Sequence, residues 1–310
     1  MSLKFSVKHL LPISKKDCTY RPLTNGVLLN GKHAGTVILI HGLTGTTHEM
    51  GYLARFLNRK GYNVITVRLA NHGKPMAVLM KTKWQEFYES VEQALRNALS
   101  VSNGGPVFVA GLCMGAILAL LLAEDYPEQI SAAGCLSTTM FYDGWGMPWC
   151  RRFLPVAYRT PLKHFLFFKE DPPYGVKDPV IQKSIQKSYS TARLDDTEGV
   201  DETGYAYLPV TLLHQHHLLV KHVAKRLASI ELPVQLIQAL DDDTTSIKNS
   251  QFVYDRIRSK MKEIVLLENS YHVITVDQER DKVAEKLYEF FSRVQAGRIV
   301  PAETAKSKLV

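Results

Sequence analysis

The sequence predicts an α/β fold, a mostly parallel central sheet with helices on both faces. Three observations predict it. Short apolar runs rich in β-branched residues alternate with segments of helical period, and a glycine-rich turn joins one such run directly to an apolar helix. The alternation is interrupted only once, over residues 141–228. Parallel strands are covered on both faces, so they read as continuous apolar runs of this kind.

The individual elements follow from the same alternation. Strands are predicted at residues 36–40, 63–67, 106–110, 132–136, 233–237 and 263–267, and helices at 47–60, 84–98, 114–124, 247–259 and 278–294. In the helical segment 84–98, for example, Val91, Leu95 and Ala98 share one face. Apolar residues three and four positions apart are the mark of an amphipathic helix.

The interruption is rich in Pro, Tyr, Phe, His and Lys and contains no clear strand. A structureless loop of that length is uncommon inside a compact domain. We therefore expect residues 1–140 and 229–296 to form the α/β core, and residues 141–228 to form an inserted helical cap or lid. The polar tail, residues 297–310, is expected to be disordered.

Composition restricts the class of protein. The formal net charge of +8 would suit nucleic acid or an anionic surface, but the Lys and Arg residues are scattered. We expect a solvated basic surface and no nucleic-acid partner. No stretch approaches the ~20 apolar residues of a transmembrane segment, and the N-terminus lacks the apolar region of a signal peptide. The four cysteines match no zinc pattern. A cytoplasmic protein with reduced thiols is expected.

The strongest motif is Gly111-Leu-Cys113-Met-Gly115, which lies between a predicted strand and a predicted helix. This is the context of a nucleophile elbow, Gly-x-Ser-x-Gly, with cysteine in place of serine. Small residues two positions away let the strand and the helix pack closely, and the helix N-terminus favours a thiolate anion at Cys113. The alternative is a structural cysteine buried in a tight turn.

A second glycine-containing turn, His41-Gly-Leu-Thr-Gly45, follows the strand 36–40. In folds with a nucleophile elbow, the loop after this strand supplies one backbone N–H of the oxyanion hole, and the residue after the nucleophile supplies the other. Those residues are Leu43 and Met114. An ordinary glycine turn remains possible, but a dinucleotide-binding loop is a poor match because Gly-x-Gly-x-x-Gly is absent.

Acidic and imidazole side chains follow the last two strands. Asp241, Asp242 and Asp243 come directly after the strand near residue 237, and His272 follows the strand ending at residue 267. The chain order of nucleophile, acid and histidine is the one this fold requires. The histidine would take the thiol proton and the carboxylate would hold its tautomer. Spacing alone leaves the choice among the three aspartates open.

Three segments resemble the carboxylesterase and monoacylglycerol-lipase branch of the α/β hydrolases. They are Ser-Tyr-His-Val-Ile-Thr-Val-Asp-Gln-Glu at 270–279, Leu-Ile-His-Gly-Leu-Thr-Gly at 39–45 and Asn-His-Gly at 71–73. In those esterases the acid lies four residues after the Gln of a Gln-Ala pair, so the resemblance implies Asp242. Cys113 departs from the family pattern. Dienelactone hydrolases and polyhydroxyalkanoate synthases resemble this chain in using cysteine at the elbow.

Together these features predict an acyl-transfer enzyme with the triad Cys113, His272 and Asp242. It would hydrolyse an ester or thioester through an acyl-thioester intermediate. One alternative is an acyltransferase that passes an acyl group from an acyl-carrier protein or coenzyme A thioester to an alcohol or amine. Another is a non-catalytic binding protein. We expect no cofactor, and no metal at His214, His216, His217 and His222, because no carboxylate accompanies them.

Overall fold

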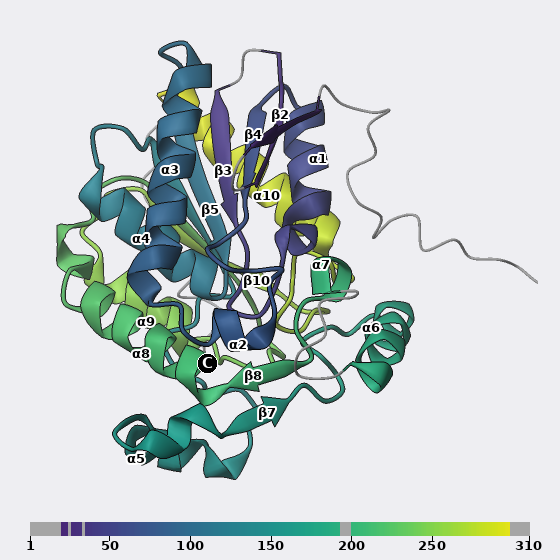
Figure 1. Ribbon diagram of the computed structural model, residues 1–310. Coiled ribbons are helices and arrows are strands. Elements are labelled where there is room, and N and C mark those ends of the chain that lie inside the picture. Colours follow the sequence, from purple (N-terminus) through teal and green to yellow (C-terminus); the bar gives the residue numbers. More distant parts are fainter. Residues whose placement is uncertain (1–19, 24–25, 33–34, 193–199, 298–310) are drawn as a thin grey trace, which may run out of the picture.

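A computed structural model describes residues 20–23, 26–32, 35–192 and 200–297. Their core is an eight-stranded sheet in the order β1-β2-β4-β3-β5-β6-β9-β10 (Figure 1). From β4 to β10 neighbouring strands are parallel, and β1 and β2 form an antiparallel edge. The predicted α/β sheet is confirmed. The strands are β1 (Tyr20–Leu23), β2 (Gly26–Leu29), β3 (Thr36–Ile40), β4 (Asn63–Val67), β5 (Val107–Leu112), β6 (Ala132–Leu136), β9 (Val234–Ala239) and β10 (Lys262–Leu267).

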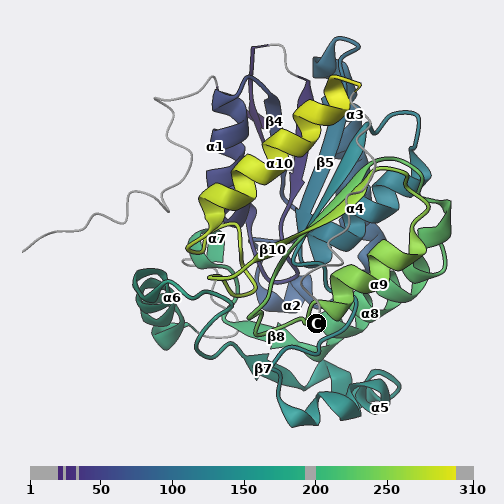
Figure 2. The same ribbon diagram turned by 180° about the vertical axis from the view of Figure 1, so that it is seen from behind.

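Helices cover both faces of the sheet. Figures 1 and 2 show α3 (Trp84–Ser102), α4 (Met114–Asp125), α8 (Val210–Ala224) and α9 (Lys248–Arg256) on one face, with α1 (Gly51–Arg59) and α10 (Arg280–Gln295) on the other. The sheet has a hydrophobic core on each face, and a central strand contributes side chains to both cores because successive side chains point to opposite faces. In β3, Ile38 and Ile40 join the core under α4, whereas Val37 and Leu39 join the core under α1 and α10.

Helix α4 is the most completely enclosed helix of the described chain, with every residue from Met114 to Ala123 buried. It packs on β5 and β6 on one side and on α8 and α3 on the other. A helix that is apolar on all faces needs such cover. The elbow that precedes α4 is therefore fixed at both ends, by a central strand and by a buried helix.

The sequence predictions differ from the structure at four places. The helix predicted at 47–60 is divided into η1 (Thr47–Met50) and α1, and the β1-β2 hairpin and the short α2 (Met76–Leu79) were not predicted. The prediction that residues 141–228 contain no strand is wrong, because β7 (Phe167–Lys169) pairs antiparallel with β8 (Tyr207–Pro209). Strands of three residues are too short to show a period in the sequence.

Residues 141–228, called the insertion below, lie between β6 and β9. Besides β7, β8 and α8 they form η2 (Trp149–Phe153), α5 (Leu154–Tyr158), η3 (Pro161–His164), α6 (Pro179–Thr191), α7 (Val200–Thr203) and η4 (Leu227–Ser229). The predicted tail beyond Gly297 and Cys18 lie outside the described residues. Within the described ranges, no helix has the length and apolarity needed to cross a membrane.

Candidate active site

Cys113 occupies a strained turn between β5 and α4, with φ 57° and ψ −115°. The flanking glycines are required by close backbone contacts. A Cβ at Gly111 would lie 2.1 Å from the carbonyl carbon of Gly115, and one at Gly115 would lie 2.3 Å from the carbonyl oxygen of Ile40. Strain of this kind persists where the surroundings hold it, and it is concentrated at functional sites.

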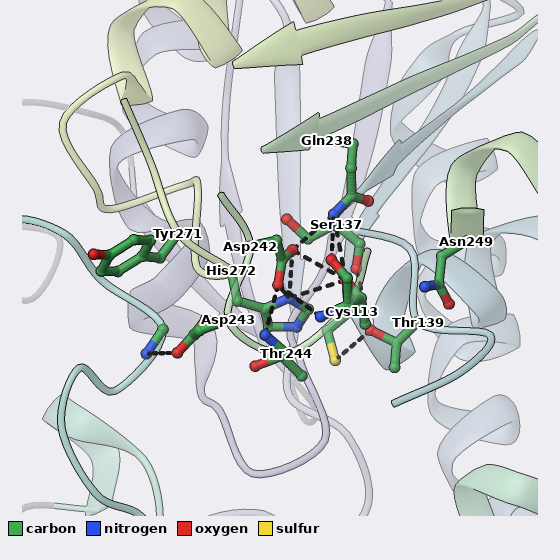
Figure 3. Close-up of polar contacts among 12 residues, drawn as sticks. Cys113, Ser137, Thr139, Gln238, Asp242, Asp243, Thr244, Asn249, Tyr271 and His272 are labelled. Carbon is green, nitrogen blue, oxygen red and sulfur yellow. Dashed lines mark hydrogen bonds and ion pairs between the residues drawn. The ribbon is translucent and has the colours of Figure 1, made fainter. Parts of the chain in front are cut away.

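His272 and Asp242 lie in contact beside this turn (Figure 3). The imidazole Nδ1 is 2.9 Å from Asp242 Oδ2 and 3.1 Å from Oδ1. The carboxylate also accepts hydrogen bonds from Gln238 Nε2 at 2.7 Å, from the Thr244 and Thr245 amides at 2.8 Å each, and from the Thr245 hydroxyl at 3.0 Å. These donors hold the carboxylate in one position beside His272.

The other two aspartates of the predicted acidic turn face elsewhere. Asp241 is half-exposed and its Oδ2 lies 3.2 Å from Lys177 Nζ. Asp243 accepts a hydrogen bond from the Gly175 amide, at 3.1 Å. Of the three, Asp242 is the one within hydrogen-bond distance of His272.

The imidazole of His272 is buried, and its charge state reflects its neighbours. Burial lowers its pKa, but the Asp242 carboxylate and then Cys113 outweigh burial and hold the pKa well above its ordinary value. Its second nitrogen, Nε2, has no hydrogen-bond partner within the described part of the chain. His272 and Cys113 line the same cavity. Nε2 is thus available to exchange a proton beside the thiol.

Thr139 is a member of the site that the sequence analysis missed. Its Oγ1 donates a hydrogen bond to Cys113 Sγ at 3.1 Å (Figure 3). The segment after β6 is fixed by Asn249 Oδ1, which accepts from the Met140 amide at 2.8 Å and from the Phe141 amide at 2.6 Å. The available signal was Ser-Thr-Thr at 137–139, a polar run at the carboxyl end of a predicted strand, where such sheets bind ligands.

The predicted oxyanion donors are Leu43, which lines this cavity, and Met114, the first residue of α4. The amides of Leu43 and Met114 donate to no group in the described ranges. The loop is held by imidazoles: His41 Nε2 accepts from the Leu69 amide at 3.2 Å, and His72 Nε2 donates to the Leu43 carbonyl at 2.9 Å. Burial lowers the pKa of both histidines, which keeps them neutral.

A cavity of about 170 Å³ is lined by Leu43, Cys113 and His272. Its lining also includes residues of the loop 42–49 and of the insertion. The insertion contributes side chains from α6, α7 and β8 and from the segments that follow β6 and β7. They are Tyr142, Glu170, Tyr174, Val176, Ile181, Ser184, Ile185, Tyr189, Thr203 and Leu208.

The four histidines weighed as metal ligands lie apart from this cavity. His216 Nδ1 is 2.9 Å from the Tyr142 hydroxyl, and His214 stacks on Tyr158. Over the ranges that the structure covers, no three metal-ligating side chains are grouped as an ion would need.

Comparison with known proteins agrees with this geometry. Residues 31–279 match the family described as "Serine aminopeptidase, S33". The chain is 27% identical to the thermostable monoacylglycerol lipase of Bacillus sp. strain H-257 over 264 residues, which is 83% of this chain and 90% of the lipase. It is 22% identical to the carboxylesterase of Bacillus subtilis over 258 residues, 83% of this chain and 92% of the esterase.

Solved structures share the fold. A lipolytic enzyme of the metagenome-derived LipS and LipT study superposes with a TM-score of 0.71 at 24% identity, covering 88% of this chain and 98% of that one. The monoglyceride lipase of Saccharomyces cerevisiae gives 0.70 at 16% identity, covering 89% and 94%. The sheet order, elbow and cavity are those of an α/β hydrolase, and the protein is an enzyme of that fold, similar to lipases and esterases. The chain belongs to the S33 serine aminopeptidase family named above.

Proposed function

We propose that this protein is an acyl-transfer hydrolase in which Cys113 attacks the carbonyl carbon of an ester or thioester. The observation that carries the proposal is the position of Cys113, on a strained turn at a cavity that it shares with His272, whose imidazole is held by Asp242. A nucleophile, a base and a group that orients the base are the three parts that covalent acyl transfer needs.

Acylation begins with Cys113 as a thiolate and His272 as an imidazolium. With Asp242 keeping His272 protonated, the thiolate of Cys113 attacks the carbonyl carbon and the carbonyl oxygen becomes an oxyanion. The amides of Leu43 and Met114 donate to this oxyanion. His272 Nε2 then gives its proton to the leaving oxygen or sulfur, the bond to the leaving group breaks, and the acyl group remains on Sγ as a thioester.

Deacylation uses the neutral imidazole left by the first half-reaction. His272 Nε2 takes a proton from the acceptor, whose oxygen or nitrogen attacks the thioester carbon. The carbon–sulfur bond breaks and the Cys113 thiolate is restored next to protonated His272. With water as acceptor the enzyme is an esterase or thioesterase. With an alcohol or amine it is an acyltransferase, and coenzyme A or acyl-carrier thioesters become acyl donors.

Cys113 is distinguished from the other described cysteines by its surroundings. Cys135 is buried in β6, and burial raises the pKa of its thiol to about 12. Cys150 lies in η2 and does not line the cavity. Thiolate character and access together control cysteine reactivity. Iodoacetamide should therefore modify Cys113 ahead of Cys135 and Cys150.

The insertion serves, in this proposal, as a cap. Its residues line the cavity together with Cys113 and His272, which supports a division into a core (1–140 and 229–296) and a cap (141–228). Exclusion of water by such a cover favours transfer of the thioester to another acceptor. The similar proteins named as monoacylglycerol lipase and carboxylesterase support an ester as the substrate.

The function is tested with p-nitrophenyl esters and acyl-coenzyme A thioesters of increasing chain length, with and without an added alcohol or amine. We expect the wild type to turn these substrates over with ping-pong kinetics. The Cys113→Ala variant should show no turnover. Turnover that is rapid and unaffected by acceptors leaves plain hydrolysis as the function. Unchanged turnover in Cys113→Ala refutes the cysteine mechanism.

A further inference from the structure

A second concave surface lies outside the catalytic cavity, where residues of the core meet residues of the insertion. It is a groove of about 470 Å³, lined by α2 and the residues that follow it, by η3 and by the first turns of α8. None of its described lining residues also lines the catalytic cavity. Its size is in the range of sites that bind small organic molecules. It is called the basic groove below, and its polar lining comprises Lys81, Lys83, Lys163, His164, Thr211, His214 and Gln215.

The basic groove gathers positive charge, and no aspartate or glutamate is among the described residues that line it. Lys81 and Lys83 precede α3 and are exposed, whereas Lys163 is half-buried in η3. In the part of the chain that the structure covers, none of the three ammonium groups forms an ion pair with a carboxylate. Like charges around one concave surface repel one another unless an anion binds between them.

Lys163 is held at the groove by two acceptors. Its Nζ donates to the Tyr158 carbonyl at 3.2 Å and lies 3.4 Å from His214 Nδ1. An ammonium group can only donate, so Nδ1 is the acceptor and the imidazole proton is on Nε2. Burial, and then the charge of Lys163, lower the pKa of His214, which agrees with a neutral ring. Because an ammonium has three N–H donors, Lys163 keeps one for a ligand.

The first turn of α8 adds uncharged donors to the groove. Thr211 is only 5% exposed, it lines the groove, and its Oγ1 has no hydrogen-bond partner among the described residues. A buried hydroxyl is normally hydrogen-bonded, so this one indicates a group that binds there. The N-cap residue of α8 is Pro209, and no side chain caps this end of the 15-residue helix. The N-terminus of such a helix attracts an anion.

The basic groove is adjacent to the catalytic cavity. Leu208 lines the cavity and Thr211 lines the groove, and three peptide units keep their Cα atoms within about 11 Å of each other. On α8, His216 contacts the cavity side, because its Nδ1 is 2.9 Å from the hydroxyl group of Tyr142, which lines the cavity. An anion in the groove therefore has two sources to be distinguished. It is either a separate compound or one end of an acyl donor that reacts at Cys113.

We propose that the basic groove binds a phosphate-bearing ligand, whose oxygens accept hydrogen bonds from the three lysines and from the hydroxyl group of Thr211. A phosphate group offers several charged acceptor oxygens, which suits a lining of ammonium groups, a hydroxyl group and a helix N-terminus. A carboxylate, with two oxygens and one charge, would leave more of these donors unpaired. The inference goes beyond the proposed function and does not depend on it.

Titration calorimetry with adenosine 3′,5′-bisphosphate, inorganic pyrophosphate and adenosine tests the inference. We expect the two phosphate compounds to bind, with an affinity that falls as KCl is added, and adenosine not to bind. Lys163→Gln and Thr211→Val should each weaken binding of the bisphosphate about tenfold. Lys286→Gln, at an exposed position on α10, is the matched control and should leave the affinity unchanged.

A second variant guards against loss of folding, because Lys163 also donates to the Tyr158 carbonyl. Lys81 and Lys83 are exposed, so the Lys81→Gln/Lys83→Gln double variant should unfold at the Tm of the wild type. We expect it to bind the bisphosphate at least tenfold more weakly. The inference is wrong if neither phosphate compound binds, or if all these variants bind the bisphosphate as the wild type does.

Kinetics with octanoyl-coenzyme A and octanoyl-pantetheine decide the source of the phosphate, because the two thioesters differ only in the phosphorylated nucleotide. A kcat/KM at least tenfold higher for the coenzyme A thioester, with the difference lost in Lys163→Gln, supports the inference and assigns the phosphate to the acyl donor. Equal kcat/KM, with bisphosphate binding as expected, supports it and assigns the phosphate to a separate compound.

The two proposals fail separately. If no ester or thioester acylates Cys113 but the bisphosphate binds and the groove variants weaken it, the proposed function is wrong and the phosphate site stands. If Cys113 is acylated and no phosphate compound binds, the phosphate site is wrong and the proposed function stands.

Discussion

Two regions beside the cavity differ in how their carboxyl groups are held: the carboxyl edge of the sheet, behind His272, and the insertion. Asp242, at the carboxyl edge of the sheet, receives hydrogen bonds from Gln238, Thr244 and Thr245 in addition to its contact with His272. Glu170, in the insertion, receives none from the described residues. A group whose hydrogen bonds are complete before a substrate arrives is organised for chemistry. One whose bonds are incomplete is left for the substrate to satisfy, which is a means of selection.

The largest effect is expected at the nucleophile. Cys113→Ala removes the atom that would carry the acyl group, so turnover of a p-nitrophenyl ester should fall by about 10⁴-fold or more. The substitution should change Tm little, because Cys113 is only partly buried, at the cavity and at the edge of the core under α1 and α10. Steady-state kinetics and thermal unfolding, run side by side, measure both. Residual activity near that of the wild type would place the chemistry elsewhere.

The second largest effect is expected at the triad acid, Asp242, and the neighbouring aspartates Asp241 and Asp243 serve as controls. Asp242→Asn should lower kcat by about 10³- to 10⁴-fold, because the imidazole loses the group that fixes its tautomer and its charge. Asp241→Asn, at a half-exposed position paired with Lys177, should change kcat by less than about threefold. Equal losses in the two variants, or a larger loss in Asp243→Asn, would remove Asp242 from its proposed role.

The triad at the sheet edge could be predicted from the sequence because its signals are local and repeated. A Cβ at Gly111 would lie 2.1 Å from the carbonyl carbon of Gly115, and a Cβ at Gly115 would lie 2.3 Å from the carbonyl oxygen of Ile40 on β3. Two such constraints leave a pattern of five residues. Cys113, Asp242 and His272 each follow a strand that could be predicted from its apolar run, so their order along the chain could be predicted as well. Choosing among the three aspartates needed a resemblance, since nothing in the residues alone distinguishes them.

The cavity residues outside the triad could not be predicted in this way. Glu49, from η1, and Glu170, from the insertion, are far apart in sequence but line one cavity. The position of Glu170 depends on the pairing of β7 with β8. Thr139 was missed for a related reason: its contact with Cys113 depends on how β6 ends beside β5, which no periodicity reports. Side chains that select a ligand come from such irregular connections, where sequence patterns are weakest.

A smaller effect is expected at Thr139, which links the sheet edge to the nucleophile. Thr139→Val removes the donor to Cys113 Sγ and keeps the shape, so the thiolate loses one hydrogen bond. Alkylation of Cys113 by iodoacetamide should slow by about tenfold at pH 6, and Thr139→Ser should restore most of the rate. The pH profile of alkylation separates this role from a structural one. A profile identical to that of the wild type would show that the hydroxyl does not act on the thiolate.

The smallest effect is on stability and comes from Glu49. Burial raises its pKa from 4.5 to about 7 in the folded protein. The folded state thus binds this proton more tightly than the unfolded state, so stability is highest below the unfolded pKa and is lost as pH rises through about 7. Glu49→Gln should therefore match the wild type near pH 4.5 and exceed its free energy of unfolding by about 1–3 kcal/mol at pH 8.

Urea unfolding of the wild type and of Glu49→Gln at several pH values measures the two free energies of unfolding. Glu289→Gln, exposed on α10, controls for the loss of one surface charge. A Glu49→Gln variant that is less stable than the wild type at pH 8 would mean that the ionised carboxylate stabilises the loop through the Gly42 amide.

Intact mass spectrometry can show directly whether Cys113 carries the acyl group. The protein is mixed with each p-nitrophenyl ester and acyl thioester, quenched in acid within seconds, weighed, and digested to locate the adduct. We expect a mass increase equal to one acyl group, located on the peptide that contains Cys113 and released by hydroxylamine. An adduct on another residue, or turnover with no adduct at Cys113 in either the wild type or Asp242→Asn, would contradict it.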